Sequence, residues 1–414
     1  MGDDENEAGR RLGGAYLKRL RMLGTNLVAV SAAGPGLVRL RTVDPSEVAK
    51  ALADSLSGGP PIATLPVDPI ERGRAIGTLQ PDQPVVEADA AVVVATSGST
   101  GAPKGVVLSR AAIRASVQAT HSRLGGVGDW VLALPTYYIA GLMVLARACL
   151  GSTRAVPVGS DLRHLQEAVG TLSERRYISL VPAQLDRALC RDDVTKALAS
   201  FSAVLVGGGP TDVGLVERAR AARIKVVTTY GMSETCGGCI YDGEPLPGVV
   251  VDLADDDRIL IRSNTLFAGY RLRPDLTAQA VVDGRFRTQD RGTWDAGRLV
   301  VLGRTDDIVI TGGHKVDLAD VEQSVQRWAA DHGARGAVLG VADQVWGTTI
   351  IAVSDRPGSL ADLQAVVRES LPTYAMPREL IHLDPLPLLA NGKPDRIAIR
   401  SMIMNLRAER EATA

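Results

Sequence analysis

Short apolar runs alternate with amphipathic stretches along much of the chain. The first long apolar run covers residues 90–95, and further runs that predict strands lie at 130–134, 178–181, 203–206 and 225–229. Between the runs, apolar positions recur with helical spacing, as at residues 110–120, where Ser109 is the expected N-cap. Strands that alternate with helices form parallel sheets, so the pattern predicts an α/β fold.

The pattern changes after residue 245. Short apolar runs with tight turns at 249–253, 259–262 and 299–302 are typical of a small barrel or an antiparallel sheet. From residue 307 on, strand and helix patterns alternate again. We therefore expect two domains, a large one over residues 1–304 and a small α/β domain over residues 305–414.

Composition and charge exclude several classes of protein. A chain of 414 residues is long enough for two or three domains of about 150 residues each. The formal net charge of -1 predicts no basic face for nucleic acid. No apolar run has the length of a membrane span, and the first residues lack the basic-then-apolar order of a signal peptide. We expect a cytoplasmic protein that neither binds nucleic acid nor inserts into a membrane.

The cysteines and histidines form no recognisable disulfide or metal pattern. Four cysteines are too few for a disulfide framework in a chain of this length. Cys236 and Cys239 have C-x-x-C spacing, but no second pair or nearby histidine completes a zinc site. The five histidines also lack metal-ligand spacing. We expect the Cys236 and Cys239 pair to be reduced and structural.

A loop rich in glycine and hydroxyl side chains follows the first apolar run. It consists of Thr96, Ser97, Gly98, Ser99, Thr100, Gly101, Ala102, Pro103, Lys104 and Gly105. The backbone amides and hydroxyls of such a loop can surround a polyphosphate. A Walker P-loop is disfavoured, because Pro103 has no N–H to donate and Gly105 has no hydroxyl for magnesium.

Two further polar segments directly follow predicted strands. Gly208 and Gly209 belong to a glycine cluster, where missing side chains let a flat ring approach the backbone. The second segment begins at Tyr230 and Gly231 and continues to Thr235. In it, an aromatic ring can stack on adenine, a hydroxyl can contact phosphate and a carboxylate can hold Mg²⁺.

In this order, the segments resemble those of the adenylate-forming superfamily, which includes acyl- and aryl-CoA ligases, peptide-synthetase adenylation domains and luciferases. The resemblance covers about residues 90 to 400. It implies a large N-terminal domain of layered α/β sheets plus a small barrel-like sheet, followed by a small mobile C-terminal α/β domain. It also implies an enzyme that uses ATP to form an acyl-AMP and then a CoA thioester.

The resemblance also implies roles for individual residues in binding ATP. The implied ATP-binding set is Thr96, Ser97, Gly98, Ser99, Thr100, Gly101, Lys104, Gly208, Gly209, Tyr230, Gly231, Ser233, Asp290 and Arg304. Asp290 would accept from two ribose hydroxyls, and Arg304 would support the ribose or a phosphate. Glu234 would hold Mg²⁺. Two departures from the superfamily pattern are Ser233, where threonine is more usual, and Gln289, where glycine is more usual.

The C-terminal part carries the remaining implied roles. Asp306 corresponds to the hinge between the domains, and a glycine loop with Gly312, Gly313 and Lys315 would line the path of the CoA thiol. Lys393 follows an Asn-Gly turn signal and would be the catalytic lysine that bridges the carboxylate and the α-phosphate.

Within the superfamily, the chain resembles the o-succinylbenzoate–CoA ligases of menaquinone biosynthesis. Residues 179–185 and 134–141 carry this likeness, together with only about ninety residues ahead of the phosphate loop. Tyr138 stands at the edge of the implied acyl pocket, where that family commonly has histidine. Tyrosine keeps an aromatic ring and a hydrogen bond, but it is not a base near neutral pH.

Several alternatives remain open at this point. The chain could be another acyl- or aryl-CoA ligase, or a stand-alone adenylation domain that loads a carrier protein. A protein of a different class, a nucleotide-binding regulator without turnover, would bind ATP but would not exchange pyrophosphate. The expected partners are a small carboxylic acid, ATP and CoA, with Mg²⁺ as cofactor, and a homodimer is allowed for.

Overall fold

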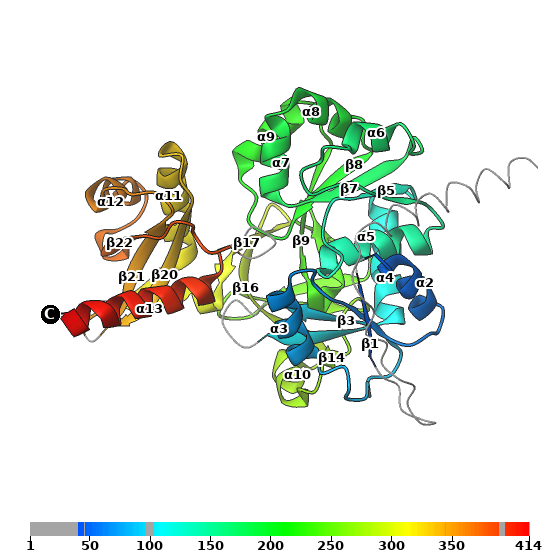
Figure 1. Ribbon diagram of the computed structural model, residues 1–414, viewed down its shortest axis with the longest axis horizontal. Helices are drawn as coiled ribbons and strands as arrows, with labels where there is room; N and C mark the ends of the chain where they lie inside the picture. Colours follow the sequence, from blue (N-terminus) through cyan, green and yellow to red (C-terminus); the bar gives the residue numbers. More distant parts are fainter. Residues whose placement is uncertain (1–39, 45, 97–102, 344, 389–393, 414) are drawn as a thin grey trace, which may run out of the picture. The chain divides into compact units, whose positions relative to one another are not determined.

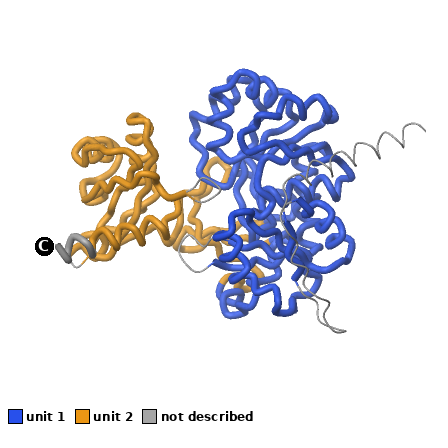
Figure 2. The backbone as a smooth tube through the Cα atoms, viewed as in Figure 1, with its two compact units in different colours: residues 1–97, 103–249, 263–279 blue, residues 98–102, 250–262, 280–414 orange. Residues whose placement is uncertain are grey.

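The computed structural model describes residues 40–44, 46–96, 103–343, 345–388 and 394–413. The chain forms two compact units, which Figure 2 shows in two colours. Unit 1 comprises residues up to 97, 103–249 and 263–279, and unit 2 comprises residues 98–102, 250–262 and 280–414. The boundary expected after residue 304 lies inside unit 2. That residues 305–414 form a separate mobile domain stays a prediction.

Unit 1 contains two sheets. The first has five strands in the order β1-β2-β3-β4-β14, parallel from β1 to β3 and antiparallel from β3 to β14. Its strands are β1 (Arg41–Val43), β2 (Ile62–Thr64), β3 (Ala90–Thr96), β4 (Lys104–Ser109) and β14 (Gly269–Tyr270). The predicted run at residues 90–95 is therefore confirmed as a strand, and its first five residues are buried.

A strand that the sequence did not predict lies between the phosphate loop and the helix expected at residues 110–120. Lys104 begins β4, which pairs antiparallel with β3 so that Thr96 lies opposite Lys104. The apolar residues Val106, Val107 and Leu108 are fully buried in this strand, which explains why the chain returns along the sheet before it turns into a helix. That helix then begins as predicted, and Ser109 Oγ accepts from the Ala112 N–H at 3.0 Å.

The second sheet of unit 1 has seven strands in the order β11-β10-β9-β8-β7-β5-β6. Strands β6, β5, β7, β8 and β9 are parallel, and β10 and β11 extend the sheet antiparallel. The strands are β5 (Asp129–Leu132), β6 (Ala155–Pro157), β7 (Arg176–Leu180), β8 (Ala203–Gly207), β9 (Val226–Met232), β10 (Gly237–Tyr241) and β11 (Glu244–Pro245). The four parallel strands predicted between residues 130 and 229 are confirmed.

Helices cover these sheets, as Figure 1 shows for α6 to α9 around β7 and β8. The core between them contains Ile178, Leu185, Leu198, Phe201 and Val204, all fully buried. The helices of unit 1 are α2 (Val48–Leu56), α3 (Pro69–Leu79), α4 (Arg110–Arg123), α5 (Ile139–Leu150), α6 (Leu165–Val169), α7 (Pro182–Leu189), α8 (Asp192–Ala199), α9 (Val213–Ala221) and α10 (Pro274–Ala280), with the 3₁₀ turn η1 (Ser233–Thr235).

Unit 2 contains the small barrel-like sheet predicted from the sequence. Its order is β12-β13-β16-β15, with β17 paired to β16. The strands are β12 (Val249–Leu253), β13 (Arg258–Ser263), β15 (Val281–Val282), β16 (Arg285–Asp295) and β17 (Arg298–Arg304). The 3₁₀ turn η2 (Thr305–Asp307) then leads to the last sheet.

The last sheet has the order β19-β18-β21-β20, with β22 parallel to β21. Alternate residues of β20 and β21 face two separate cores, because side chains on a strand point to opposite faces in turn. Val338 and Ile350 pack with Trp328 in one core, whereas Leu339 and Ile351 pack with residues of the C-terminal helix in the other. The elements are β18 (Ile308–Thr311), β19 (His314–Asp317), α11 (Leu318–Asp331), β20 (Gly336–Asp343), β21 (Gly347–Ser354), α12 (Leu360–Arg368), η3 (Thr373–Ala375), β22 (Glu379–His382) and α13 (Arg396–Thr413).

The cysteines are free thiols, and Cys236 and Cys239 are buried. Burial raises the pKa of the Cys239 thiol to about 12, with smaller opposing effects of hydrogen bonds, so the thiol stays protonated near neutral pH. The expectation of a reduced, structural pair agrees with this environment. Among the helices of the described residues, none is both long and apolar enough to cross a membrane.

Candidate active site

Two of the predicted nucleotide segments lie at the same edge of the seven-stranded sheet. Strands β8 and β9 are parallel and Gly207 pairs with Thr229, so Gly208, which follows β8, and Tyr230, in the last three residues of β9, lie at the carboxyl ends of neighbouring strands. The sequence predicted that the strand would end at residue 229, but β9 continues to Met232 because Tyr230 and Gly231 pair with β10. This edge is where open α/β sheets usually bind ligands. A Cβ atom on Gly207 would lie 2.1 Å from Thr229 Oγ1, which leaves room only for glycine.

Glu234 and Lys104 come together around one aromatic ring. The Tyr270 hydroxyl donates to Glu234 Oε1 at 2.8 Å, and Lys104 Nζ lies 4.8 Å from the centroid of the Tyr270 ring. The Thr96 hydroxyl donates to the Lys104 carbonyl at 3.2 Å, which ties the two ends of the phosphate loop. The predicted residues Ser97, Gly98, Ser99, Thr100 and Gly101 lie outside the described residues.

Tyr270 is a residue that the sequence reasoning missed. It sits in a strand of two residues, so neither periodicity nor a polar motif distinguishes it. Burial, followed by the charge of Glu234, raises the pKa of the Tyr270 hydroxyl. The hydroxyl therefore stays protonated and serves as a hydrogen-bond donor to the carboxylate.

The chemistry of Glu234 fits Mg²⁺. Over the described parts of the chain, no group of three or more His, Cys, Asp or Glu side chains could hold a metal ion by itself. Magnesium usually binds through one or two carboxylates, several waters and the phosphates of its substrate, rather than in a cage of protein ligands. A single half-buried carboxylate near a lysine, as here, is suited to that mode.

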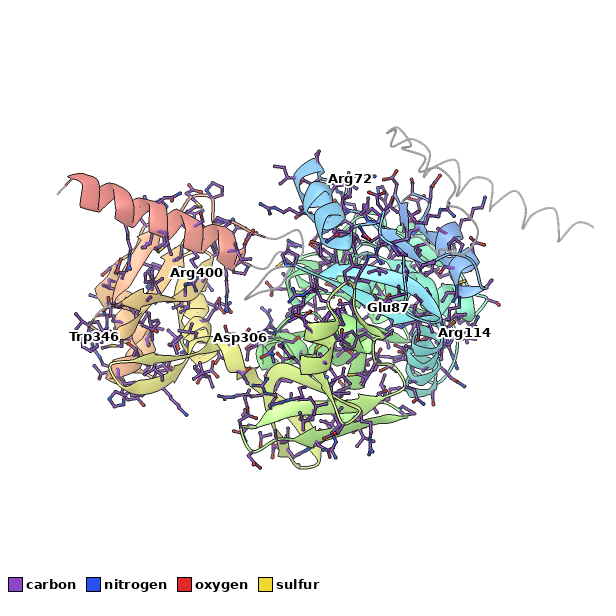
Figure 3. The ribbon with its side chains drawn as sticks, turned by 90° about the horizontal axis from the view of Figure 1, so that it is seen from below. Arg72, Glu87, Arg114, Asp306, Trp346 and Arg400 are labelled. Atoms are coloured by element: carbon purple, nitrogen blue, oxygen red, sulfur yellow. The ribbon has the colours of Figure 1, made fainter. Side chains whose placement is uncertain are left out.

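In unit 2, the predicted ribose and hinge residues share one arginine. Arg304 Nε and Nη2 donate to the two carboxylate oxygens of Asp306 at 2.8 Å each, and Nη1 lies 3.4 Å from Asp290 Oδ1. Burial opposes the charge of Arg304, but the hydrogen bonds and charge of Asp306, and then the charge of Asp290, outweigh it and raise its pKa. The charged guanidinium therefore joins the two carboxylates; Asp306 is labelled in Figure 3.

A second arginine holds the segment that follows the predicted catalytic lysine. Arg396 Nη1 binds Asp307 Oδ1 at 2.6 Å, and its Nη2 binds Glu322 Oε2. These contacts fasten the start of α13 to the residue next to Asp306 and to α11. Lys393 itself lies outside the described residues.

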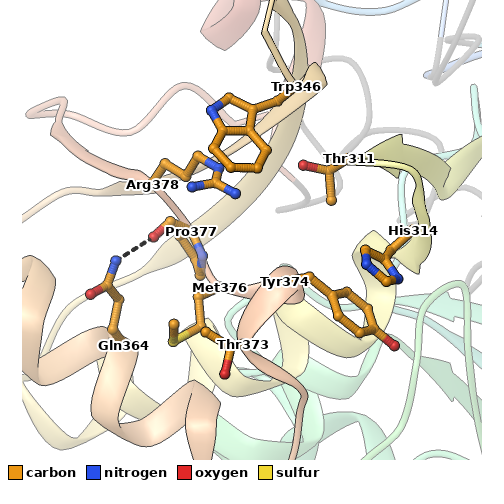
Figure 4. Close-up of a pocket in the computed structure, with 10 residues that line it drawn as sticks. Thr311, His314, Trp346, Gln364, Thr373, Tyr374, Met376, Pro377 and Arg378 are labelled. Atoms are coloured by element: carbon orange, nitrogen blue, oxygen red, sulfur yellow. Dashed lines mark hydrogen bonds between the residues drawn. The ribbon is translucent and has the colours of Figure 1, made fainter.

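Unit 2 also contains a cavity beside the predicted glycine loop, shown in Figure 4. Its volume is about 470 Å³, and its wall is made by Thr311, Gly312, His314, Trp346, Gln364, Thr373, Tyr374, Met376, Pro377 and Arg378. The Arg378 guanidinium lies 3.4 Å from the Trp346 ring centroid, and the His314 and Tyr374 rings stack with their centroids 4.2 Å apart. The cavity therefore offers flat aromatic surfaces and one cation.

The glycine loop shapes this cavity directly. The Gly312 N–H donates to the Trp346 carbonyl at 2.9 Å, and a Cβ on Gly312 would lie 3.0 Å from the Trp346 ring. Gly313 and Lys315 are exposed in the same hairpin. Trp346, Tyr374 and Arg378 were not predicted, because each lies in a separate turn or short segment that carries no motif.

Tyr138 is the N-cap residue of α5, and its ring lies 4.7 Å from that of Tyr137. Burial, followed by the charge of Glu71, raises the pKa of the Tyr138 hydroxyl. Tyr138 therefore cannot act as a base at neutral pH, although it can donate a hydrogen bond. The nearby hydroxyl of Thr136 is buried and has no hydrogen-bond partner among the described residues.

The fold and these sites define an adenylate-forming enzyme, and comparison with known families agrees. Residues 28–271 match the model of the AMP-binding enzyme family, and residues 330–393 match the model of the AMP-binding enzyme C-terminal domain. The chain belongs to the AMP-binding enzyme family. A relative from Mycobacterium tuberculosis, named probable 2-succinylbenzoate–CoA ligase, is 43% identical over 364 residues, which is 84% of this chain and 93% of the relative.

Solved structures share the fold. The o-succinylbenzoate CoA synthetase of Bacillus subtilis in complex with the acyl-adenylate intermediate matches with a TM-score of 0.69 at 24% identity, over 87% of this chain and 82% of the other. The same synthetase in complex with ATP and a magnesium ion matches with a TM-score of 0.67 at 24% identity, over 84% and 80% of the two chains. At this identity the likeness shows the fold alone.

Proposed function

We propose that this chain is an o-succinylbenzoate–CoA ligase of menaquinone biosynthesis, which uses ATP, Mg²⁺ and CoA. The 43% identity to a relative named probable 2-succinylbenzoate–CoA ligase, over 84% of this chain and 93% of the relative, carries the proposal. The pairing of Glu234 with Tyr270 beside Lys104 supports it from the structure, because these are the groups that binding of MgATP needs.

In the first half-reaction, a carboxylate oxygen of the acid attacks the α-phosphorus of ATP. The bond to pyrophosphate breaks, and an acyl-AMP forms. Lys104 and the loop at residues 96–101 bind the phosphates, and Lys393 places its charge between the carboxylate and the α-phosphate. Glu234 would hold Mg²⁺, which neutralises phosphate charge when bound.

The proposed function assigns an aromatic ring, two glycines and a carboxylate to the adenosine. Tyr230 supplies a flat surface for adenine, while Gly208 and Gly209 allow the ring to approach the backbone. Asp290 accepts from the ribose hydroxyls, and Arg304 donates a hydrogen bond to that carboxylate and so orients it. These assignments predict that each residue acts on the affinity for ATP rather than for the acid.

In the second half-reaction, the CoA sulfur attacks the carbonyl carbon of the acyl-AMP and loses its proton, and AMP leaves. The cavity next to Gly312 supports a site for part of CoA, because Trp346 and Tyr374 offer stacking surfaces for an adenine and Arg378 a cation for a phosphate. We propose that the small C-terminal domain rotates about Asp306 between the two steps. The rotation withdraws Lys393 from the reacting groups and brings in the Gly312 loop. Splitting the reaction in this way replaces a poor leaving group by a good one.

The deciding experiment is pyrophosphate exchange, measured with o-succinylbenzoate beside benzoate and fatty acids, followed by thioester formation with CoA. Exchange with o-succinylbenzoate alone is expected. Exchange only with another acid would make the chain a different acyl- or aryl-CoA ligase. ATP binding without exchange for any acid would refute an enzymatic function.

Two less specific expectations belong to the same proposal. A cytoplasmic location fits an enzyme that draws on ATP and CoA, and cell fractionation tests it. A homodimer is expected only because two-fold symmetric dimers are the commonest oligomers. Light scattering during size-exclusion chromatography tests it.

A further inference from the structure

The side chain of Tyr270 links two groups that the proposed function assigns to MgATP. Its hydroxyl donates to Glu234 Oε1 at 2.8 Å, and its ring face lies 4.8 Å from Lys104 Nζ. The Phe267 ring packs against the Tyr270 ring in a tilted arrangement, with centroids 4.8 Å apart. One buried side chain therefore touches both the carboxylate and the cation.

The backbone around Tyr270 is held firmly. Strand β14 pairs with β4, so that Tyr270 lies opposite Val106, two residues after Lys104. The Tyr270 N–H donates to Thr277 Oγ1 at 2.8 Å. The Phe267 N–H donates to the Glu234 carbonyl at 2.8 Å, which joins the segment that carries Tyr270 to the turn that carries Glu234.

The next residue adds a second anchor. Arg271 is buried, and its guanidinium donates to the backbone carbonyls of Leu79, Gln80, Gln83 and Pro84. The backbone N–H of Arg271 donates to the Gly105 carbonyl at 2.7 Å. A ring fixed by such contacts can hold a neighbouring carboxylate in one rotamer, which is what a preorganised metal ligand requires.

We propose that Tyr270 is a positioning residue, which orients Glu234 for Mg²⁺ through its hydroxyl and Lys104 for the phosphates through its ring. This inference rests on the proposed function and adds a residue to it. The hydroxyl donates to one oxygen of the carboxylate and so fixes the direction of the whole group toward the metal. The ring face attracts the ammonium group and limits the positions that the flexible lysine can take.

The test measures ATP binding by calorimetry at several Mg²⁺ concentrations, without any acid, so that no turnover occurs. Tyr270→Phe keeps the ring and loses the hydroxyl. Mg²⁺ increases the affinity for ATP, and the Mg²⁺ concentration that gives half of this increase is expected to be about tenfold higher in Tyr270→Phe. The reason is that a hydrogen bond to a charged group is lost. Tyr270→Leu also loses the ring and should weaken ATP binding further.

The matched control is Tyr241→Phe. Tyr241 is fully buried in unit 1, and its hydroxyl bonds to Thr120 Oγ1 at 3.1 Å, away from Glu234 and Lys104 in the hydrogen-bond network. Its removal should lower the melting temperature without changing the Mg²⁺ dependence. A double variant of Tyr270→Phe with Glu234→Gln should need no more Mg²⁺ than Glu234→Gln alone, because the tyrosine acts through the carboxylate.

Three outcomes would overturn the proposal. They are an unchanged Mg²⁺ dependence in folded Tyr270→Phe, an equal change in Tyr241→Phe, and additive effects in the double variant. If Tyr270→Phe fails to fold, Thr277→Val replaces it: loss of the acceptor for the Tyr270 N–H should shift the Mg²⁺ dependence in the same direction, and no shift would overturn the proposal. Wild-type protein without pyrophosphate exchange would instead refute the proposed function, so the two failures are distinct.

Discussion

Arg396 joins α13 to two carboxylates within unit 2, and its removal has a calculable consequence. Its guanidinium binds Asp307 at 2.6 Å and also binds Glu322, and the side chains of Arg396, Asp307 and Glu322 are 24%, 9% and 15% exposed. Arg396→Ala would leave two largely buried carboxylates without this partner. We expect a loss of about 3 kcal/mol in the free energy of unfolding of unit 2, at the low end for a broken buried pair because some water reaches the arginine.

The loss should depend on pH. Burial raises the pKa of the Glu322 carboxyl, while the charge and hydrogen bond of Arg396 lower it. Without Arg396 the pKa of Glu322 rises further, so the native state binds more protons than the unfolded state. A carboxyl with a raised native pKa contributes stability below its ordinary pKa of 4.5 and loses it as the pH rises through the native pKa. Arg396→Ala should therefore be more destabilised at pH 8 than at pH 5.

Hydrogen exchange of the Leu318–Asp331 helix, with urea unfolding of the full chain, measures this effect. Arg335→Ala is the matched control in the same unit, since Arg335 is 56% exposed and its pair with Asp355 should be worth less than about 1 kcal/mol. Glu322→Gln should recover part of the loss in the Arg396→Ala background. Equal losses in the Arg396 and Arg335 variants, or a loss independent of pH, would refute the reasoning.

Three further predictions concern catalysis and stability. Lys393→Ala should abolish formation of acyl-AMP but still convert supplied acyl-AMP to thioester; equal loss of both half-reactions would contradict the rotation about Asp306. Trp346→Ala should raise the KM for CoA about tenfold, as expected for a lost stacking contact of 1–3 kcal/mol, while pyrophosphate exchange stays unchanged. Burial, and then the charge of Arg147, lowers the pKa of His121, so the free energy of unfolding should fall as the pH drops below 6.5. The midpoint of urea unfolding should fall less over this pH range in His121→Gln than in the wild-type protein.

Much of the fold follows from local patterns in the sequence. The apolar runs at 178–181 and 203–206 predict strands, and β7 and β8 occupy nearly the same residues. The segments at the carboxyl ends of β8 and β9 were also recognisable as binding segments, because parallel strands place their carboxyl ends at one edge. The helix at residues 110–120 was predicted correctly, but β4 ahead of it was not, because a short apolar run after a glycine fits either a strand or a helix.

The sequence by itself determined the order of strands and helices and the types of side chain available for ATP chemistry, since these depend on neighbours a few positions apart. Only the tertiary structure decided that Tyr270 touches Glu234, 36 positions away, and that Arg378 lies over Trp346. The first contact follows from the hydrogen bond that joins the Phe267 N–H to the Glu234 carbonyl beside the pairing of β14 with β4. The second follows from the way the turn before β21 meets the segment before β22. Pairing between distant strands is set by packing of the whole unit, which no local pattern encodes.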